Sequence, residues 1–207
     1  MLVVAPTQNW AWQLRRFVTP PPPVERCELC GAVIPSAHPH LVEIAARRLL
    51  CACRACATTL DHEGGALRRV PDRVHALPGF SLSDAEWDAL QIPIGLAFLY
   101  RSTPLDRAVA LYPGPAGAIE SLLPIDGWSH IVARSPALAR ITPDVEALLV
   151  NRQQGEGQYY LVPIDRCFAL VGLIRRHWRG LSGGAEAWRA IDAFFDALRL
   201  ETAASHG

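Results

Sequence analysis

Residues 27–31 read Cys-Glu-Leu-Cys-Gly, and residues 51–56 read Cys-Ala-Cys-Arg-Ala-Cys. Each stretch holds a pair of cysteines separated by two residues, Cys27 and Cys30 in the first and Cys53 and Cys56 in the second. This spacing is typical of the knuckles that hold a structural zinc ion with four thiolates in tetrahedral geometry. The pattern therefore predicts a metal site formed by these four cysteines.

The 22 residues between the two knuckles contain two largely apolar stretches, 41–45 and 48–51, which are long enough for a β-hairpin. Two knuckles at the ends of a hairpin form a zinc ribbon, so we expect residues 24–60 to be a zinc-ribbon-like module. Four protein ligands leave no open coordination position, and the predicted role of Zn²⁺ is therefore structural. The alternative is iron, because the same thiolates also suit a rubredoxin-like centre or an iron–sulfur cluster.

Cys51 is the spare cysteine of the second stretch. Three roles stay open for it: a ligand in place of Cys53, a ligand of a cluster, or a buried strand residue. His38 and His40 flank Pro39, which favours an extended backbone. We expect the two histidine side chains to diverge and to lie at the surface or behind the ligands, without binding one metal ion together.

The rest of the chain divides around this module. Residues 1–23 form an N-terminal segment that ends in four prolines, which predict a stiff polyproline II spacer. Residues 61–80 are rich in glycine and proline and are expected to be a linker to a second domain, residues 81–202. The N-terminus lacks the pattern of a signal peptide, and no apolar run is long enough to span a bilayer. We therefore expect a cytoplasmic protein with no membrane span.

The second domain starts with a helix signal and continues with strand patterns. Ser83 followed three residues later by Glu86 predicts a capping box. Strands are predicted from apolar runs at residues 94–100, 107–112, 145–150 and 159–164. The last two runs flank a glycine-containing loop, which indicates a β-hairpin. Helical turns are expected between the two pairs, within residues 125–139.

Two amphipathic patterns predict helices at the C-terminal end of the chain. Apolar residues recur at offsets of three and four within 167–178 and again within 188–198, and glycines at 180, 183 and 184 separate the two patterns. The predicted fold class is therefore α+β. It consists of a small Cys₄ zinc-ribbon module followed by an antiparallel sheet packed against C-terminal helices.

The composition excludes several kinds of protein. The chain has 207 residues, and all 20 of its basic residues are arginines. Schiff-base enzymes, P-loop NTPases and protein kinases need a specific lysine, so they are excluded in their usual form. The 20 acidic residues bring the formal net charge to zero, which argues against a nucleic-acid partner.

Four further features of the sequence carry predictions about single residues or short segments. Glu120 lies among apolar residues and would need a partner such as arginine if it is buried. Asp165 is expected to cap the N-terminus of the first C-terminal helix, and Cys167 is expected to be a buried structural thiol. Residues 175–179 contain Arg175, Arg176, His177 and Arg179. This basic tip is expected to offset the negative end of the helix dipole, with contact to a partner or an anion as the alternative.

Six short strings stand in a defined order along the chain, and together they resemble one family. They are RCELCG at 26–31, CACRAC at 51–56, VPDR at 70–73, YPGPAGA at 112–118, DVEALLV at 144–150 and HWRG at 177–180. Over roughly residues 26–200 the chain resembles a bacterial family of unassigned function associated with gene clusters of actinobacterial-type high-affinity NiFe hydrogenases. The resemblance implies an accessory or maturation role and carries no active-site residues.

The expected function is that of a non-enzymatic accessory protein. Its zinc ion stabilises the small module, and its larger domain contacts a protein partner, such as a hydrogenase subunit or a maturation factor. The first alternative is an electron carrier that holds iron in the same thiolates. The second is an enzyme that uses a pocket near Glu120, Asp165 and Arg166.

Overall fold

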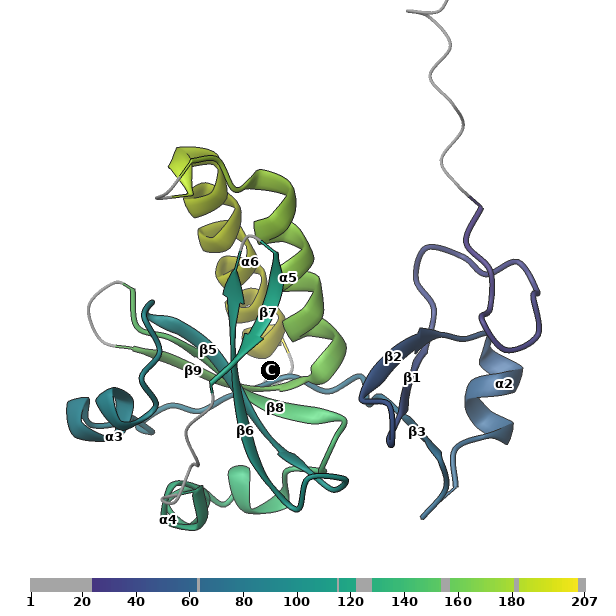
Figure 1. The fold of residues 1–207 in the computed structure, drawn as a ribbon, viewed down its shortest axis with the longest axis horizontal. Coiled ribbons are helices and arrows are strands. Elements are labelled where there is room, and N and C mark those ends of the chain that lie inside the picture. The colour runs from purple at the N-terminus through teal and green to yellow at the C-terminus, as the bar shows by residue number, and fades with distance from the viewer. Residues whose placement is uncertain are drawn as a thin grey trace, which may run out of the picture.

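The computed structural model describes residues 24–62, 64–114, 116–121, 128–153, 157–180 and 183–204. These residues form two antiparallel sheets of unequal size, accompanied by helices (Figure 1). The predicted α+β class is therefore confirmed. The predicted N-terminal segment and its proline spacer, residues 1–23, lie outside the described residues.

The small sheet has three strands in the order β2-β1-β3. Their bounds are β1 His40–Glu43, β2 Arg48–Cys51 and β3 Leu67–Arg69. The β1–β2 hairpin pairs His40 with Cys51 and Leu41 with Leu50. A short helix, α2 (Arg54–Thr59), follows the hairpin and packs beside it. The hairpin confirms the prediction made from the apolar stretches between the knuckles.

The large sheet has six antiparallel strands in the order β4-β9-β8-β5-β6-β7. Their bounds are β4 His75–Ala76, β5 Leu96–Ser102, β6 Arg107–Gly114, β7 Gly117–Glu120, β8 Glu146–Asn151 and β9 Gln158–Pro163. All four strands predicted from apolar runs are present, and β8 and β9 form the predicted hairpin pairing.

Both faces of the large sheet are covered, and alternating residues of each strand enter different cores. In β5, Phe98 points into the core beneath the C-terminal helices, whereas Ala97 and Leu99 enter the core on the opposite face. That second core is closed by α3 (Asp84–Ala89), α4 (Trp128–Ala133) and η1 (Leu138–Arg140). Cover on both faces explains why the strands are nearly continuous apolar runs.

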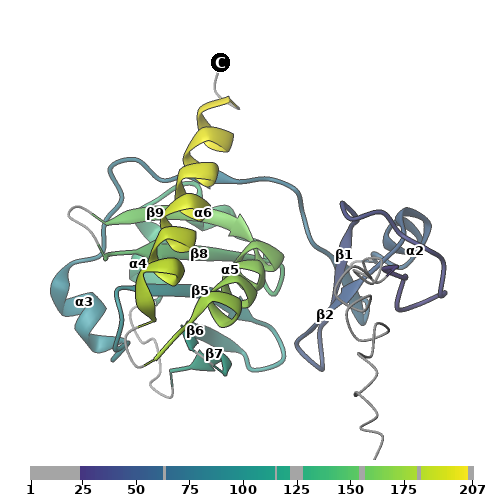
Figure 2. The ribbon, with the colours of Figure 1, turned by 90° about the horizontal axis from the view of Figure 1, so that it is seen from above.

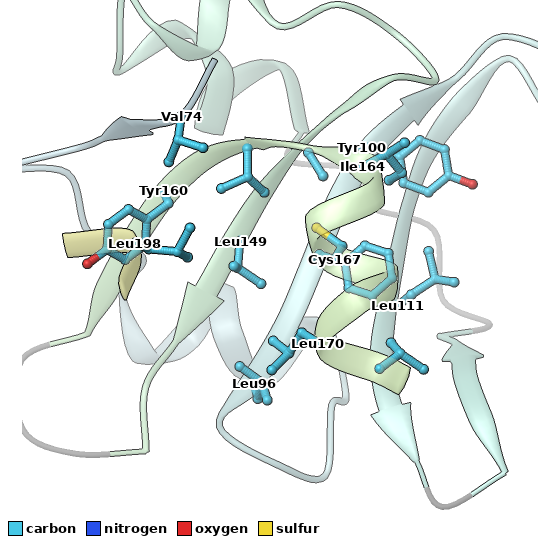
Figure 3. Packing of buried hydrophobic residues seen from close by; sticks show 14 of the residues in the cluster. Val74, Leu96, Tyr100, Leu111, Leu149, Tyr160, Ile164, Cys167, Leu170 and Leu198 are labelled. Atoms are coloured by element: carbon cyan, nitrogen blue, oxygen red, sulfur yellow. The ribbon is translucent and has the colours of Figure 1, made fainter. Parts of the chain in front are cut away.

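The C-terminal helices are α5 (Ile164–His177) and α6 (Gly184–Ala204), and they lie together across one face of the sheet (Figure 2). Their buried residues follow the predicted offsets, with Cys167, Leu170 and Ile174 on α5. Cys167 is fully buried among apolar neighbours, which include the labelled Ile164 and Leu170 (Figure 3). The predicted burial of the Cys167 thiol is confirmed. No described helix is both long and apolar enough to cross a lipid bilayer.

The helix α3 begins at the predicted capping box. The N–H of Glu86 donates to Ser83 Oγ at 3.3 Å, and Glu86 Oε2 accepts from the Ser83 N–H at 2.8 Å. The helical turns expected within residues 125–139 are also present, as α4 and η1.

Residues 61–80 are more structured than expected. We expected a linker, but Leu67–Arg69 pairs with β1 as β3, and His75–Ala76 pairs with β9 as β4. The two strands have three and two residues, too few for an alternating pattern to stand out in the sequence. The segment therefore belongs in part to each sheet.

The small sheet packs against the large domain through one face. Val42 and Leu49 are cross-strand neighbours in the β1–β2 hairpin, and both contact the core beneath α5. Leu41 and Leu50 point the other way, into the small core that also contains Cys27. The hairpin is thus buried on both faces, with the cysteine knuckles on one side and the large domain on the other.

Candidate metal centre

The first knuckle is a tight turn around Gly31. The Gly31 N–H donates to Cys27 O at 2.8 Å, and the Cys27 N–H donates to Ala32 O at 2.8 Å. Gly31 has a φ of 74°, a conformation in which a side chain would be strained. The turn places Cys27 and Cys30 in one group of sulfur atoms.

The second knuckle is the N-terminus of α2. Cys53 is the N-cap residue, and its Sγ accepts a hydrogen bond from the Cys56 N–H at 3.4 Å. A helix N-terminus stabilises a thiolate, because its unpaired N–H groups point toward the negative charge. Cys56 lies in the first turn of the same helix.

The four predicted cysteines come together. One sulfur atom from each of Cys27, Cys30, Cys53 and Cys56 lies within 4.8 Å of the other three. The Sγ atoms of Cys30 and Cys53 are 3.7 Å apart. In a tetrahedral zinc site with Zn–S bonds of about 2.3 Å, two sulfur atoms are about 3.8 Å apart. All four cysteines are free thiols, and the donor set fits a metal ion.

The thiols of this group differ in acidity. Burial opposes ionisation of Cys27, but the N–H groups of Cys53, Leu29 and Cys30 favour its thiolate and lower its pKa to about 6. Hydrogen bonds from the Cys56 thiol to Cys53 and Cys30 raise the Cys56 pKa to about 12. Without metal, Cys27 is therefore the more acidic of these two thiols, and Cys56 keeps its proton at neutral pH.

Cys51 stands apart from these four. It pairs with His40 across the β1–β2 hairpin and groups with His38 and His40. Its N–H donates to Glu28 Oε1 at 2.8 Å. Of the three roles left open for Cys51, replacement of Cys53 is not the arrangement seen, because Cys53 lies with the other knuckle cysteines.

The two histidines do not diverge, and the sequence-based prediction is wrong on this point. The ring centroids of His38 and His40 are 4.8 Å apart. The physical reason is the period of extended backbone: adjacent side chains point to opposite sides, but residues i and i+2 share a side.

Asp165 is also placed differently from the prediction. The N-cap of α5 is Pro163, with no side-chain hydrogen bond. Asp165 lies in the first turn and bonds His40, with Oδ2 2.9 Å from Nδ1. No sequence pattern joins two residues 125 positions apart, so reasoning from the sequence missed this contact.

Glu120 has the arginine partners that partial burial requires. Its Oε2 accepts from Arg47 Nη2 at 2.8 Å, and its Oε1 accepts from Arg107 Nη2 at 2.7 Å. Burial raises its pKa, but the two guanidinium groups outweigh burial and hold the pKa below its ordinary value. Glu120 is not among the residues that line the cavity bordered by Asp165 and Arg166.

The basic tip is the C-terminal end of α5. Arg175, Arg176 and His177 occupy the last turn. Arg179 Nη1 donates to the carbonyl oxygens of Trp178 and Arg176 at 3.0 and 3.3 Å. These bonds satisfy helix-end carbonyl groups, as expected for residues that offset the dipole.

Comparison with protein families gives one match. The family of unknown function DUF5947 matches residues 26–202, which include both knuckles, both sheets and nearly all of α6. The chain belongs to this family. No curated protein matches the chain, and no solved structure does.

Proposed function

We propose that this member of the family is a non-enzymatic accessory protein with a structural zinc ion at Cys27, Cys30, Cys53 and Cys56. It acts in the cytoplasm by binding a protein partner in a NiFe-hydrogenase system, either a hydrogenase subunit or a maturation factor. The observation that carries the proposal is the gathering of four thiols into one closed donor set. The hydrogenase partner rests on the family resemblance of the sequence strings.

The size of the small core supports a structural role for the metal. Six buried residues make up the core beside the knuckles: Cys27, Ile34, Leu41, Leu50, Ala52 and Ala57. So few apolar side chains do not offset the loss of chain entropy in a module of this size. A bound zinc ion supplies the missing stabilisation, because the unfolded chain does not hold the four thiolates together.

The surface of the first knuckle supports a protein contact. Val24, Leu29 and Val33 are exposed apolar residues within one ten-residue stretch. We take these three exposed apolar side chains as the surface through which the protein contacts its partner. Val33 is 61% exposed, although it sits in the bridge with Arg26 that closes the knuckle.

The metal is tested first, on full-length protein purified without oxygen and without chelator. We expect bound zinc with no visible absorption, and zinc–sulfur distances of about 2.3 Å by X-ray absorption. Protein that folds fully with an empty Cys₄ centre would contradict the structural role.

The partner is tested by tagging the full-length chain in a native host and measuring copurified hydrogenase subunits. Leu29→Asp and Val33→Asp are expected to reduce the yield of the partner. Leu105→Asp is the matched control, because Leu105 and Leu29 are both 38% exposed and Leu105 lies in the β5–β6 turn. Equal yields of partner from all variants would contradict the proposal that the first knuckle is the contact surface. If no hydrogenase subunit copurifies, the proposed link to a hydrogenase system is wrong.

The alternative is an electron carrier with iron in the same thiolates. The observation in its favour is the exposure of Cys30, which would leave one edge of the centre open to a redox partner. The N–H groups that favour the Cys27 thiolate would also tune the reduction potential of iron. A colourless protein after anaerobic purification contradicts this alternative, whereas bound iron with charge-transfer bands contradicts the structural zinc.

A further inference from the structure

We infer that His38, His40 and Cys51 form a second metal site, distinct from the Cys₄ centre and beyond the proposed function. The site takes a late first-row transition-metal ion such as Zn²⁺, with two imidazole ligands and one thiolate. One coordination position stays open toward a cavity between the small sheet and α5.

The register of the β1–β2 hairpin brings the three side chains together. His40 and Cys51 are directly opposite each other on neighbouring strands, so their side chains leave the sheet on the same face. His38 lies two residues before His40, and the ring centroids of the two histidines are 4.8 Å apart. One ring nitrogen from each histidine and the Cys51 Sγ lie within 4.8 Å of one another, the same limit that the four knuckle thiols meet.

Hydrogen bonding selects the nitrogen that His38 offers. Its Nδ1 is 2.9 Å from the carbonyl oxygen of Pro35, and a carbonyl only accepts, so Nδ1 carries the proton in the neutral ring. Nδ1 also lies 3.4 Å from Glu25 Oε2. The side chain is 5% exposed, and its Nε2 is buried without a hydrogen-bond partner among the described residues. A buried nitrogen lone pair without a partner is costly, and a metal ion bound there would satisfy it.

His40 is oriented by a carboxylate. Its Nδ1 is 2.9 Å from Asp165 Oδ2, so Nδ1–H donates and Nε2 keeps its lone pair. A metal-binding histidine typically donates its other ring N–H to a carboxylate or a backbone carbonyl, which fixes the ring and raises its basicity. His40 has the first kind of partner and His38 the second. Asp165 is therefore a positioning residue for the site.

A cavity of about 520 Å³ borders the two histidines. Its other charged lining residues include Arg54, Arg69 and Arg166, together with Asp165 and Asp72. Three protein ligands leave the fourth tetrahedral position to water or to another small ligand, unlike the closed Cys₄ shell. The arginines favour a small anion in that position. The bound ion is thus exchangeable, whereas the Cys₄ ion is structural.

Metal content of the full-length protein after dialysis against excess Zn²⁺ tests the site. We expect about two ions per chain in the unmodified protein and about one in Cys51→Ser and in His38→Gln. The matched controls are Cys167→Ala, which removes a buried thiol elsewhere, and the exposed His75→Gln; both keep about two ions. The retained Cys₄ ion and an unchanged circular dichroism spectrum show that a variant is folded.

Titration with Co²⁺ separates the ligand sets and tests Asp165. The second equivalent bound should show a thiolate-to-cobalt band that Cys51→Ser removes, while the bands of the four-thiolate site stay. Asp165→Asn should weaken the second equivalent by about 10- to 100-fold and leave the first unchanged. A single ion per unmodified chain overturns the inference. So does a second ion that persists in both Cys51→Ser and His38→Gln.

Discussion

Arg47, in the turn between β1 and β2, donates from Nη2 to Oε2 of Glu120 in β7 at 2.8 Å and so fastens the small sheet to the edge of the large one. The same guanidinium group donates to the Tyr100 hydroxyl from Nε and Nη2, at 3.1 and 3.0 Å. Arg47 has a φ of 51°, so the turn holds an unusual backbone conformation where this contact is made. The polar contact lies beside the apolar packing of Val42 and Leu49.

The contact between Arg47 and Glu120 is expected to couple the stability of the two parts. Both side chains are more than two-thirds buried, so solvent screens the pair less than an exposed ion pair. A double-mutant cycle of Arg47→Gln and Glu120→Gln should give a coupling free energy of about 1 kcal/mol. Urea unfolding measures it. Arg48→Gln is the control, because Arg48 makes exposed ion pairs, and its coupling to Glu120 should be near zero.

Arg73 and Glu146 are expected to respond unequally to substitution. Glu146 is fully buried and accepts from Arg73 Nε at 2.6 Å and Nη2 at 2.9 Å, whereas the Arg73 side chain is half exposed. Arg73→Gln leaves a buried carboxylate without its cation and should cost about 3 kcal/mol of unfolding free energy. Glu146→Gln leaves an arginine that reaches water, so it should cost less. Unfolding at neutral pH measures both, and the reverse order would contradict this account.

The same pair predicts a loss of stability in acid. Burial raises the pKa of Glu146, but the bonds from Arg73 and Thr142 outweigh burial and lower the pKa below its ordinary value of 4.5. A carboxyl group with a lowered pKa in the folded state stabilises the protein above 4.5, and that contribution is lost as pH falls through the lowered pKa. Glu146→Gln should flatten this part of the pH profile, measured by thermal unfolding. The exposed Glu186→Gln should leave the profile unchanged.

Zinc binding at the Cys₄ centre is expected to release protons. The N–H of Ala32 favours the Cys30 thiolate, but hydrogen bonding with Cys27 raises the Cys30 pKa above its ordinary value. Cys56 also keeps its proton at neutral pH. Binding should therefore release about two protons or more, and zinc affinity should rise by about 100-fold or more per pH unit. Calorimetry in buffers of different ionisation enthalpy counts the protons, and release of fewer than one would contradict the assigned thiol states.

Removal of metal should loosen the small sheet and spare the large one. The core beside the knuckles contains six buried residues, whereas each of the two cores of the large domain contains many more. A chelator, or Cys56→Ser, should speed amide hydrogen exchange in β2 and α2. Exchange in β5 and β8 should change little. Cys167→Ala is the control that removes a thiol without removing the metal, and uniform acceleration in both sheets would contradict local unfolding.

The elements of the fold that could be predicted are those that a short stretch of neighbouring residues identifies. The capping box at Ser83 and the apolar runs of β8 and β9 need only neighbouring residues to be recognised. The short strand β7 was not predicted, because its four residues become a strand only by pairing with β6. Pairing partners far along the chain supply what local patterns do not contain.

The candidate sites divide in the same way. Both knuckles could be predicted because each places two ligands within four residues of the sequence. The group of His38, His40 and Cys51 depends on a cross-strand register, and its contact with Asp165 depends on how α5 packs against the small sheet. The His-Pro-His spacing was the available local signal, and the period of extended backbone would have placed both rings on one side.

Because β1 is buried on both faces, the hairpin should tolerate insertions and deletions poorly. Leu41 enters the small core beside the Cys₄ group, while His40 and Val42 point to the other side. An insertion of one residue within β1 would exchange the two faces and disturb both sets of donor atoms at once. Length variation among relatives should therefore avoid β1 and β2. Insertions and deletions should instead occur in surface loops, where an added residue does not move any side chain to the opposite face of a strand.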